Sequence, residues 1–360
     1  MTTQSTNNTD STPEPALDTV AVLGVGQMGL VCAQILATAP ATLGRTAPEV
    51  RVWGHSPEEV GRLAQTRTSD RLPGFHLDES VRICLSAEVA LAGADLAVSA
   101  IPVQHTREAW TGLKPRVPAG AGVVSVAKGI EHPGLLRPTQ IIAEVLADNP
   151  DAAPRPLGVL SGPTIAPELA RCLPATMIAA SDQPEFAETL QSLFTARWLR
   201  VYTNPDVLGV ELAGATKNVI AIAAGILDGL QAGANAKSAL LARGLAEIAR
   251  LGAAMGASPD TFFGIAGVGD LATTCFSPEG RNRSCGEALG KGQSLEDYLN
   301  ATPFVVEGVE TARAVRELAG RFKVEMPIAD AVYSVLFGGT DPIQAITRLM
   351  SRDPKEERVR

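Results

Sequence analysis

Cysteine and histidine are scarce in this sequence, and their positions exclude several kinds of site. The 360 residues include five widely spaced cysteines with no C-x-x-C pair: Cys32, Cys84, Cys172, Cys275 and Cys285. This usage excludes a disulfide scaffold or a zinc site built on cysteine pairs, and it is typical of a protein in the reducing cytoplasm. The four histidines all lie within the first 132 residues, without metal-ligand spacing. We therefore expect no metal, and acid–base chemistry later in the chain must use lysine, a carboxylate, cysteine or tyrosine.

An excess of positive charge is also missing. Lysine and arginine number 31 against 39 aspartates and glutamates, which gives a net charge of −8 and a pI near 5.2. Nucleic acids and anionic membranes require an excess of cations in the proteins that bind them, so neither is an expected partner. A small phosphate site built from a few local charges remains compatible with this balance.

Two uncharged or weakly charged stretches near the start are not expected to be targeting or membrane segments. Residues 1–18 contain no lysine, arginine or apolar run, and we expect a disordered tail rather than a signal or transit peptide. Residues 19–44 carry no charge, but glycine, glutamine, threonine and proline interrupt them. A strand, a tight turn and a helix explain this stretch better than a membrane span.

The residue pattern changes near residue 203, which divides the chain into two expected domains. Before it, short apolar runs alternate with amphipathic stretches, which predicts a doubly wound α/β sheet with parallel strands, a Rossmann-like domain over 19–203. After it, long Ala/Leu/Ile segments predict an all-helical domain over 204–350, followed by a polar tail over 351–360. The polar residues within the helical domain, described below, make it the expected substrate and catalytic domain. Strands are expected at 20–23, 50–53, 95–101, 122–127, 157–160, 176–180 and 199–202. The clearest helices are expected at 139–147, 185–194, 207–227, 236–255, 309–322 and 328–337.

A glycine motif follows the first expected strand. Gly24, Gly26 and Gly29 form G-x-G-x-x-G directly before a helical pattern, which indicates a dinucleotide site with pyrophosphate at the helix N-terminus. The second strand ends in Gly54-His55-Ser56, without the acidic residue that usually holds the ribose 2′-hydroxyl of NAD. NADP is therefore permitted, although His55 and Ser56 could bind either ribose or only cap the next helix.

Polar groups follow two later strands, where ligands of open α/β sheets bind. Lys128 comes directly after the strand at 122–127, and Gly162 and Thr164 come after the strand at 157–160. These residues could hold an anionic or hydroxylated ligand. The alternatives are a surface lysine on a turn and a threonine that only caps a helix.

The expected helix at 207–227 has a lysine in its middle. The helix is apolar nearly all round and should be buried, yet Lys217 has no carboxylate three or four residues away for an ion pair within the helix. Burial without a partner lowers the pKa of an ammonium group toward neutrality, which suits a proton donor and acceptor. The alternatives are a lysine that extends to water and one that pairs with a carboxylate from another segment.

Two further polar segments follow this helix. Asp270 ends a glycine-rich bend and could hold Lys217, bind a substrate hydroxyl, or cap a helix. Arg281 and Asn282 present guanidinium and amide donors suited to phosphate, or else form a solvated turn.

Taken together, the motifs resemble the bacterial NAD(P)-dependent sn-glycerol-3-phosphate dehydrogenases over about residues 19–350. The stretches that carry the resemblance are GVGQMG (24–29), VAKGIE (126–131), LSGPTIAPELA (160–170), VYTNPD (201–206), GVELAGATKNVIAIAAGILDGL (209–230), NAKSALLARGLAEIARLG (235–252), GVGDLATTC (267–275), GRNRSCG (280–286) and VVEG (305–308). The resemblance implies reduction of dihydroxyacetone phosphate to sn-glycerol 3-phosphate, the backbone of phospholipids, with NADPH or NADH.

The resemblance also implies the roles of individual residues. It assigns the catalytic proton transfer to Lys217. The expected substrate-binding residues are Lys128, Gly162, Thr164, Lys217, Asp270, Arg281 and Asn282. The expected cofactor-binding residues are Gly24, Gly26, Gln27, Met28, Gly29, His55, Lys128, Ala166, Arg281, Val305 and Glu307. Gln27-Met28 and Gly280 depart from the family pattern, which commonly has a small polar residue with an aromatic one, and a serine, at these places.

Two other functions remain open from the sequence. One is a related dehydrogenase that acts on a small hydroxy acid, with Arg281 holding the carboxylate. The other is a module that binds NAD(P) without turning it over, although a buried lysine without a partner in its helix argues against that reading. The apolar surface of the helical half also allows a homodimer.

Overall fold

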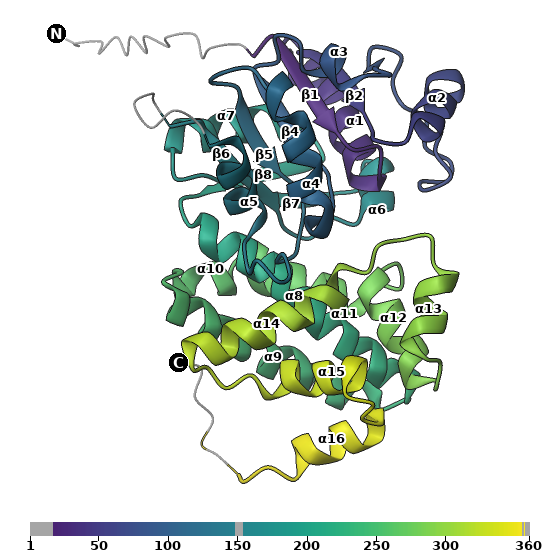
Figure 1. Cartoon of the computed structure of the whole chain (residues 1–360), viewed down its shortest axis with the longest axis vertical. Coiled ribbons are helices and arrows are strands. Elements are labelled where there is room, and N and C mark those ends of the chain that lie inside the picture. The colour runs from purple at the N-terminus through teal and green to yellow at the C-terminus, as the bar shows by residue number, and fades with distance from the viewer. Residues whose placement is uncertain (1–16, 148–153, 355, 357–360) are drawn as a thin grey trace, which may run out of the picture.

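The structure is a computed structural model, and it describes residues 17–147, 154–354 and 356. The predicted N-terminal tail lies almost wholly outside the described residues, as does half of the predicted polar tail at 351–360. A sheet half and a helical half lie one above the other, and the apolar helix α8 (Val207–Gly229) lies along the boundary between them (Figure 1).

The sheet half contains eight strands in the order β3-β2-β1-β4-β5-β6-β7-β8. The strands are β1 (Thr19–Leu23), β2 (Glu49–Trp53), β3 (Arg82–Ile83), β4 (Leu96–Ser99), β5 (Gly122–Ser125), β6 (Leu157–Ser161), β7 (Ala175–Ala180) and β8 (Leu199–Asn204). The helices of this half are α1 (Gln27–Thr42), α2 (Pro57–Thr66), α3 (Ala87–Leu91), α4 (Val103–Leu113), η1 (Lys114–Arg116), α5 (Pro138–Leu146), α6 (Ala166–Ala170) and α7 (Pro184–Phe194).

Helices cover both faces of the sheet, which confirms the predicted doubly wound fold. In β1, Val20 and Val22 pack into the layer formed with α1, α2, α6 and α7. The alternate residues, Ala21 and Leu23, pack into the opposite layer with α3, α4 and α5. A strand that is buried on both faces must be apolar at every position, which is why β1 reads as a continuous apolar run.

One strand pairing differs from the prediction of parallel strands throughout. β6 and β7 are antiparallel, whereas all other neighbouring strands are parallel. The chain between them, residues 162–174, contains only the five-residue helix α6 and lacks the longer helix that usually forms the crossover of a parallel pair. The two-residue strand β3 was also not predicted, because so short a run shows no periodicity.

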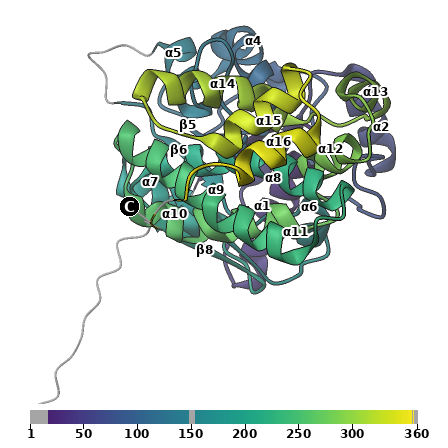
Figure 2. The same ribbon diagram turned by 90° about the horizontal axis from the view of Figure 1, so that it is seen from below.

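The second half is helical, as predicted, and is built around α8 (Val207–Gly229). The other elements are α9 (Gly233–Met255), α10 (Pro259–Phe263), the π-helical turn η2 (Ile265–Gly269), α11 (Asp270–Phe276), α12 (Arg281–Gly290), α13 (Leu295–Ala301), α14 (Glu307–Phe322), α15 (Pro327–Phe337) and α16 (Pro342–Met350). Seen from below, other helices surround α8 (Figure 2). By length and composition α8 could cross a membrane, but 94% of its most apolar window is buried inside the protein. Its apolar character is therefore explained by the core that it forms.

Candidate active site between the sheet and the helices

A cavity of about 860 Å³ lies at the point where the strand order reverses between β1 and β4. Its walls include Gly24, Trp53 and Ala100, which follow or end β1, β2 and β4. Phe304 and Val305 of the helical half close the opposite side. Ligands of doubly wound sheets bind at this switch point, so the cavity is the candidate dinucleotide site.

The glycine loop has the backbone geometry that a pyrophosphate requires. Gly24 has a φ of +122°, and a Cβ atom there would lie 2.6 Å from the carbonyl oxygen of Ala100. Gly29 packs against Gly24 so closely that a side chain would overlap its carbonyl oxygen. Gly26, at the N-terminus of α1, has no atom within 4 Å of the place of a Cβ, and it lines the cavity. The residues present thus fit a dinucleotide whose phosphates approach the backbone at Gly26.

The part of the dinucleotide cavity around His55, where adenosine is expected, also contains a carboxylate and a guanidinium that were not predicted from the sequence. His55 lines the cavity, and Ser56 caps α2 by accepting a hydrogen bond from the Glu59 amide at 3.3 Å. The side chains of Glu59 and Arg71 also line the cavity and form an ion pair at 2.6 Å. Glu59 lies four residues after His55, the residue expected at the ribose, and the dinucleotide-binding motif does not specify an acidic residue at that spacing.

A smaller cavity of about 170 Å³ adjoins the dinucleotide cavity. Six residues line both: Gln27, Met28, Val126, Arg281, Val305 and Glu307. The smaller cavity also contains both lysines singled out from the sequence, Lys128 and Lys217. A small molecule in it would therefore lie between the cofactor and two ammonium groups.

Lys217 is buried in the middle of α8 but is not without a partner. Its side chain is 7% exposed, and its Nζ donates to Oδ1 of Asp270 at 2.6 Å and to Oγ1 of Thr274 at 2.5 Å. The expectation of an unpaired amine is therefore wrong, and the alternative of a carboxylate from another segment is correct. The partner could not be found along α8, because it comes from α11, across the helix interface.

Burial dominates the acid–base properties of Lys217. Loss of hydration lowers the pKa of its ammonium group to about 8, although the negative charge of Asp270 opposes this change. The positive charge of Lys128 lowers the pKa further. A lysine that titrates near pH 8 can both donate and accept a proton under ordinary conditions.

Asp270 joins the two lysines. Its Oδ1 accepts from Lys217, and its Oδ2 accepts from Lys128 at 2.8 Å. The Asp270 side chain is only 2% exposed, and it lines neither cavity described above. Its place behind the lysines suits a group that orients their ammonium groups rather than one that touches a ligand. The π-helical turn η2 ends directly before Asp270 and so directs this side chain toward α8.

Lys128 is held by the loop that follows β6. Its Nζ also donates to the carbonyl oxygen of Gly162 at 2.8 Å and to Oγ1 of Thr164 at 3.3 Å. Thr164 is therefore not the cap of α6, a position that Ile165 occupies. Asn218 supports the same lysine, since its Nδ2 donates to the Lys128 carbonyl oxygen at 2.8 Å.

Arg281, Asn282 and Glu307 form the wall opposite the lysines. Nη1 of Arg281 is 3.4 Å from the carbonyl oxygen of Val305, and its side chain is exposed to the cavity. Oδ1 of Asn282 accepts from the Gly308 amide at 2.9 Å, which leaves its Nδ2 to donate. Burial raises the pKa of the Glu307 carboxyl, and the charge of Arg281 counteracts this effect in part.

The predicted site residues meet at this junction, but they do so in different ways. The smaller cavity is lined by Thr164, Ala166, Asn282 and the two lysines, and the larger one by the glycine loop and His55. Gly29, Gly162 and Asp270 line neither and act through the groups they contact. Thr274 was missed, although it lies one helical turn after Asp270 and that spacing could have indicated it.

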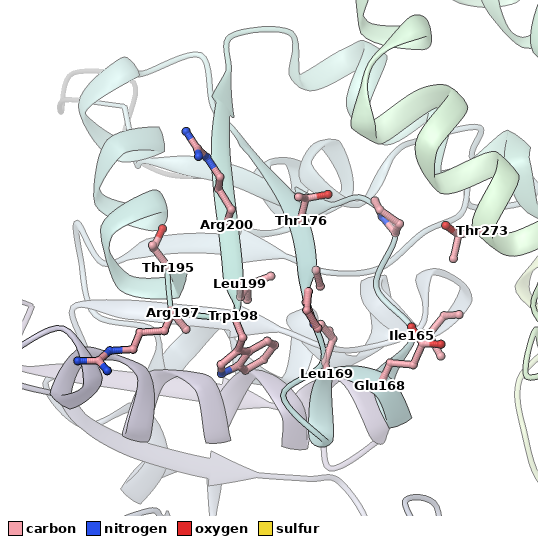
Figure 3. A pocket seen from close by; sticks show the side chains of 14 residues that line it. Ile165, Glu168, Leu169, Thr176, Thr195, Arg197, Trp198, Leu199, Arg200 and Thr273 are labelled. Carbon is pink, nitrogen blue, oxygen red and sulfur yellow. The ribbon is translucent and has the colours of Figure 1, made fainter.

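A third cleft, of about 710 Å³, lies beyond the loop that holds Lys128 (Figure 3). It is lined by the starts of β7 and β8 and by Thr273 of α11, and it contains none of the predicted site residues. The guanidinium groups of Arg197 and Arg200 point away from the space between Ile165 and Trp198 (Figure 3). This cleft therefore does not present the converging donors of the other two cavities.

Comparison with known proteins identifies the family. Models described as the N-terminus and the C-terminus of NAD-dependent glycerol-3-phosphate dehydrogenase match residues 19–187 and 206–347. A glycerol-3-phosphate dehydrogenase (NAD(P)+) of Geobacter metallireducens is 44% identical, with 94% of this chain and 98% of the relative covered. That of Pelotomaculum thermopropionicum is 43% identical, with 94% of each covered. The crystal structure of a Coxiella burnetii glycerol-3-phosphate dehydrogenase is 33% identical, with a TM-score of 0.86 over 93% of this chain and 99% of that one. The chain belongs to the NAD-dependent glycerol-3-phosphate dehydrogenase family.

Proposed function

We propose that the protein catalyses the reversible, NAD(P)H-dependent reduction of dihydroxyacetone phosphate to sn-glycerol 3-phosphate. The observation that carries this proposal is the pair of lysines joined by Asp270 beside a small cavity that adjoins the dinucleotide cavity. A nicotinamide, when bound, supplies or accepts the hydride. The family of the chain and the glycine loop support this assignment of the cofactor.

Lys217 provides the proton in this proposal. In the protonated form it stabilises the negative charge that develops on the ketone oxygen and then donates its proton to that oxygen. In the reverse direction the neutral amine accepts the proton of the alcohol. Asp270 and Thr274 fix the position of Nζ through bonds of 2.6 and 2.5 Å, so the proton is delivered from one place.

Lys128 and Arg281 supply further positive charge to the anionic substrate. Lys128 helps to polarise the ketone oxygen, or orients the nicotinamide, from the wall that it shares with Lys217. Arg281 and the free amide of Asn282 are suited to bind the substrate phosphate, because a guanidinium fork matches phosphate oxygens. These local groups explain how a chain with a net charge of −8 can bind an anion.

Steady-state kinetics on dihydroxyacetone phosphate, with NADPH and NADH side by side, test the proposal. Reduction requires protonated Lys217, so the kcat for reduction should fall as the pH rises through about 8, the pKa of this lysine. The kcat for oxidation of sn-glycerol 3-phosphate should rise over the same pH range, because oxidation requires the neutral amine. Small keto acids without phosphate serve as the control substrates. Turnover of those acids, but not of dihydroxyacetone phosphate, would contradict the proposal and support a hydroxy acid dehydrogenase.

We extend the proposal to the setting of the enzyme. The product would serve as the backbone for phospholipid synthesis, and the five free cysteines suit a reducing, cytoplasmic location. Apolar side chains on the surface of the helical half, such as Ile343 and Met350, leave a homodimer as a prediction. Light scattering on the purified protein measures the mass that decides the oligomeric state.

A further inference from the structure

Arg71 lies where three parts of the molecule meet at the dinucleotide cavity. It belongs to the loop between α2 and β3. Its carbonyl oxygen accepts from Nε2 of Gln27, in the first turn of α1, at 2.6 Å. Its Nη1 donates to the carbonyl oxygen of Pro303, in the helical half, at 3.3 Å. These contacts hold the guanidinium beside the glycine loop, on the wall of the 860 Å³ cavity.

The present partner of Arg71 can be exchanged for a stronger one. Nε and Nη2 donate to the same oxygen, Oε1 of Glu59, at 3.1 and 2.6 Å. The two side chains are 38% and 30% exposed, and ion pairs in such surroundings contribute little to stability. A phosphate group offers more charge and more acceptor oxygens to the guanidinium fork than one shared carboxylate oxygen.

The other arginines on this cavity are committed elsewhere. Arg116 pairs with Glu88 and donates to the carbonyl oxygen of Gly112 at 2.6 Å. Arg281 lies at the end shared with the smaller cavity, next to the lysines. Arg71 is thus the arginine placed between the first turns of α1 and α2.

We propose that Arg71 binds a phosphate group of the dinucleotide and that Glu59 competes with that phosphate for the guanidinium. This inference rests on the proposed function and adds to it a residue that sets cofactor affinity. Two phosphate groups have the required chemistry: the pyrophosphate at the N-terminus of α1, present in both cofactors, and the ribose 2′-phosphate of NADPH, expected beyond β2 near His55 and Glu59. The sequence alone left the choice between NADP and NAD open, and Arg71 provides a physical basis for that choice.

Cofactor binding to the full-length Arg71→Leu variant tests the proposal. Titrations with NADPH and with NADH, followed by nicotinamide fluorescence, give both dissociation constants without substrate. Loss of a charged hydrogen bond to phosphate should raise the dissociation constant about tenfold or more. An equal rise for both cofactors assigns Arg71 to the pyrophosphate, and a rise for NADPH alone assigns it to the 2′-phosphate. Arg71→Lys keeps the positive charge but lacks the guanidinium fork, so its dissociation constants should lie between those of Arg71→Leu and those of the unmodified protein.

Glu59→Gln should change the dissociation constant of the cofactor in the opposite direction from Arg71→Leu. It removes the competing carboxylate and should lower the dissociation constant of the affected cofactor by a few fold. Arg62→Leu is the matched control, because Arg62 also projects from α2, pairs with Asp70 at 3.1 Å, and does not line the dinucleotide cavity.

The outcomes separate failure of this inference from failure of the proposed function. If Arg71→Leu, with an unchanged circular dichroism spectrum, binds both cofactors as Arg62→Leu does, then Arg71 only links the two halves and the inference is wrong. A misfolded Arg71→Leu leaves the decision to Arg71→Lys and Glu59→Gln, whose unchanged constants would overturn the inference equally. If the unmodified protein binds neither NADPH nor NADH, the proposed function itself fails.

Discussion

The two halves of the molecule differ in where they bury charge. Among the described residues, the buried charged side chains of the helical half are Glu211, Lys217, Lys237, Glu247 and Asp270, and that of the sheet half is Glu131. Buried charge destabilises a fold unless it is paired or hydrogen-bonded. The helical half meets this condition through pairs such as Lys217–Asp270 and through Glu247, which accepts from two backbone amides of α15.

This difference separates binding from chemistry. The sheet half offers the dinucleotide mainly backbone, glycine and the N-terminus of a helix, which bind phosphate by shape and by dipole, with Arg71 as the proposed charged contact; it also contributes Lys128 to the pair of lysines. The helical half contributes ionisable groups whose proton affinity burial has changed. Variants in the two halves should therefore damage different steps of the same reaction.

The largest effect is expected at the buried lysine of the helical half. Lys217→Ala should lower kcat at least a hundredfold, because the proposed proton donor of the reaction is lost. The dissociation constant of NADPH should change by less than about threefold, since the cofactor binds mainly to the sheet half. Lys291→Ala removes a 61%-exposed lysine that directly follows α12 and should leave both quantities unchanged. Near-normal turnover of the Lys217 variant would refute the role of this residue.

A second prediction concerns buried charge away from the active site. Burial raises the pKa of the Glu247 carboxyl to about 7, although the amides of Ile328 and Ala329 oppose this change. The folded state therefore binds the proton more tightly than the unfolded state, and stability should fall as the pH rises from 5.5 to 8. The loss attributable to this group is about 2 kcal/mol.

Urea unfolding at the two pH values measures this effect. Glu247→Gln should show a pH dependence smaller by that amount. Asp341→Asn, which removes the charge of the exposed N-cap of α16 but keeps a capping oxygen, is the control and should keep the pH dependence of the unmodified protein. An unaltered pH dependence in the Glu247 variant would show that burial of this carboxyl costs nothing at neutral pH.

The smallest effect is expected in the sheet half. There a variant should weaken cofactor binding and leave kcat unchanged, whereas Lys217→Ala should lower kcat and leave cofactor binding nearly unchanged. Gly26 has a φ of −70° and open space where a Cβ would lie, so Gly26→Ala should fold normally. The added methyl group narrows the phosphate site and should raise the dissociation constant of NADPH by about fivefold to tenfold, with kcat at saturation unchanged. Gly61→Ala, on α2, is equally unhindered and should not alter cofactor affinity. A Gly26 variant that loses kcat but not affinity would reverse the comparison between the halves.

Much of the fold was predictable because its signals are local. Apolar runs such as Val20–Leu23 and the apolar segment of α8 follow from the burial of whole elements, and the structure has both. The antiparallel β7 was not predictable from its own residues. The connection from β6 contains no full-length crossover helix, and the five-residue helix in it looks like an ordinary turn in the sequence.

The candidate site was predictable where a motif covers it, and not where distant segments meet. The glycine loop and Lys217 stand out because each breaks the pattern around it. The ion pair of Glu59 with Arg71 and the bond from Lys217 to Thr274 join residues 12 and 57 positions apart. Neither pair could be predicted from sequence spacing, because residues that contact each other on one helix are three or four positions apart.

The sequence by itself determined the two kinds of architecture, the dinucleotide loop and the presence of a lysine inside an apolar helix. These features follow from hydrophobic periodicity and from the backbone freedom of glycine, both of which act over a few residues. Only the tertiary structure decided that Asp270 lies between Lys128 and Lys217, and that the pKa of Lys217 is near 8 rather than lower. Proton affinity in a protein interior depends on every charge within a few ångströms, and folding alone brings those charges together.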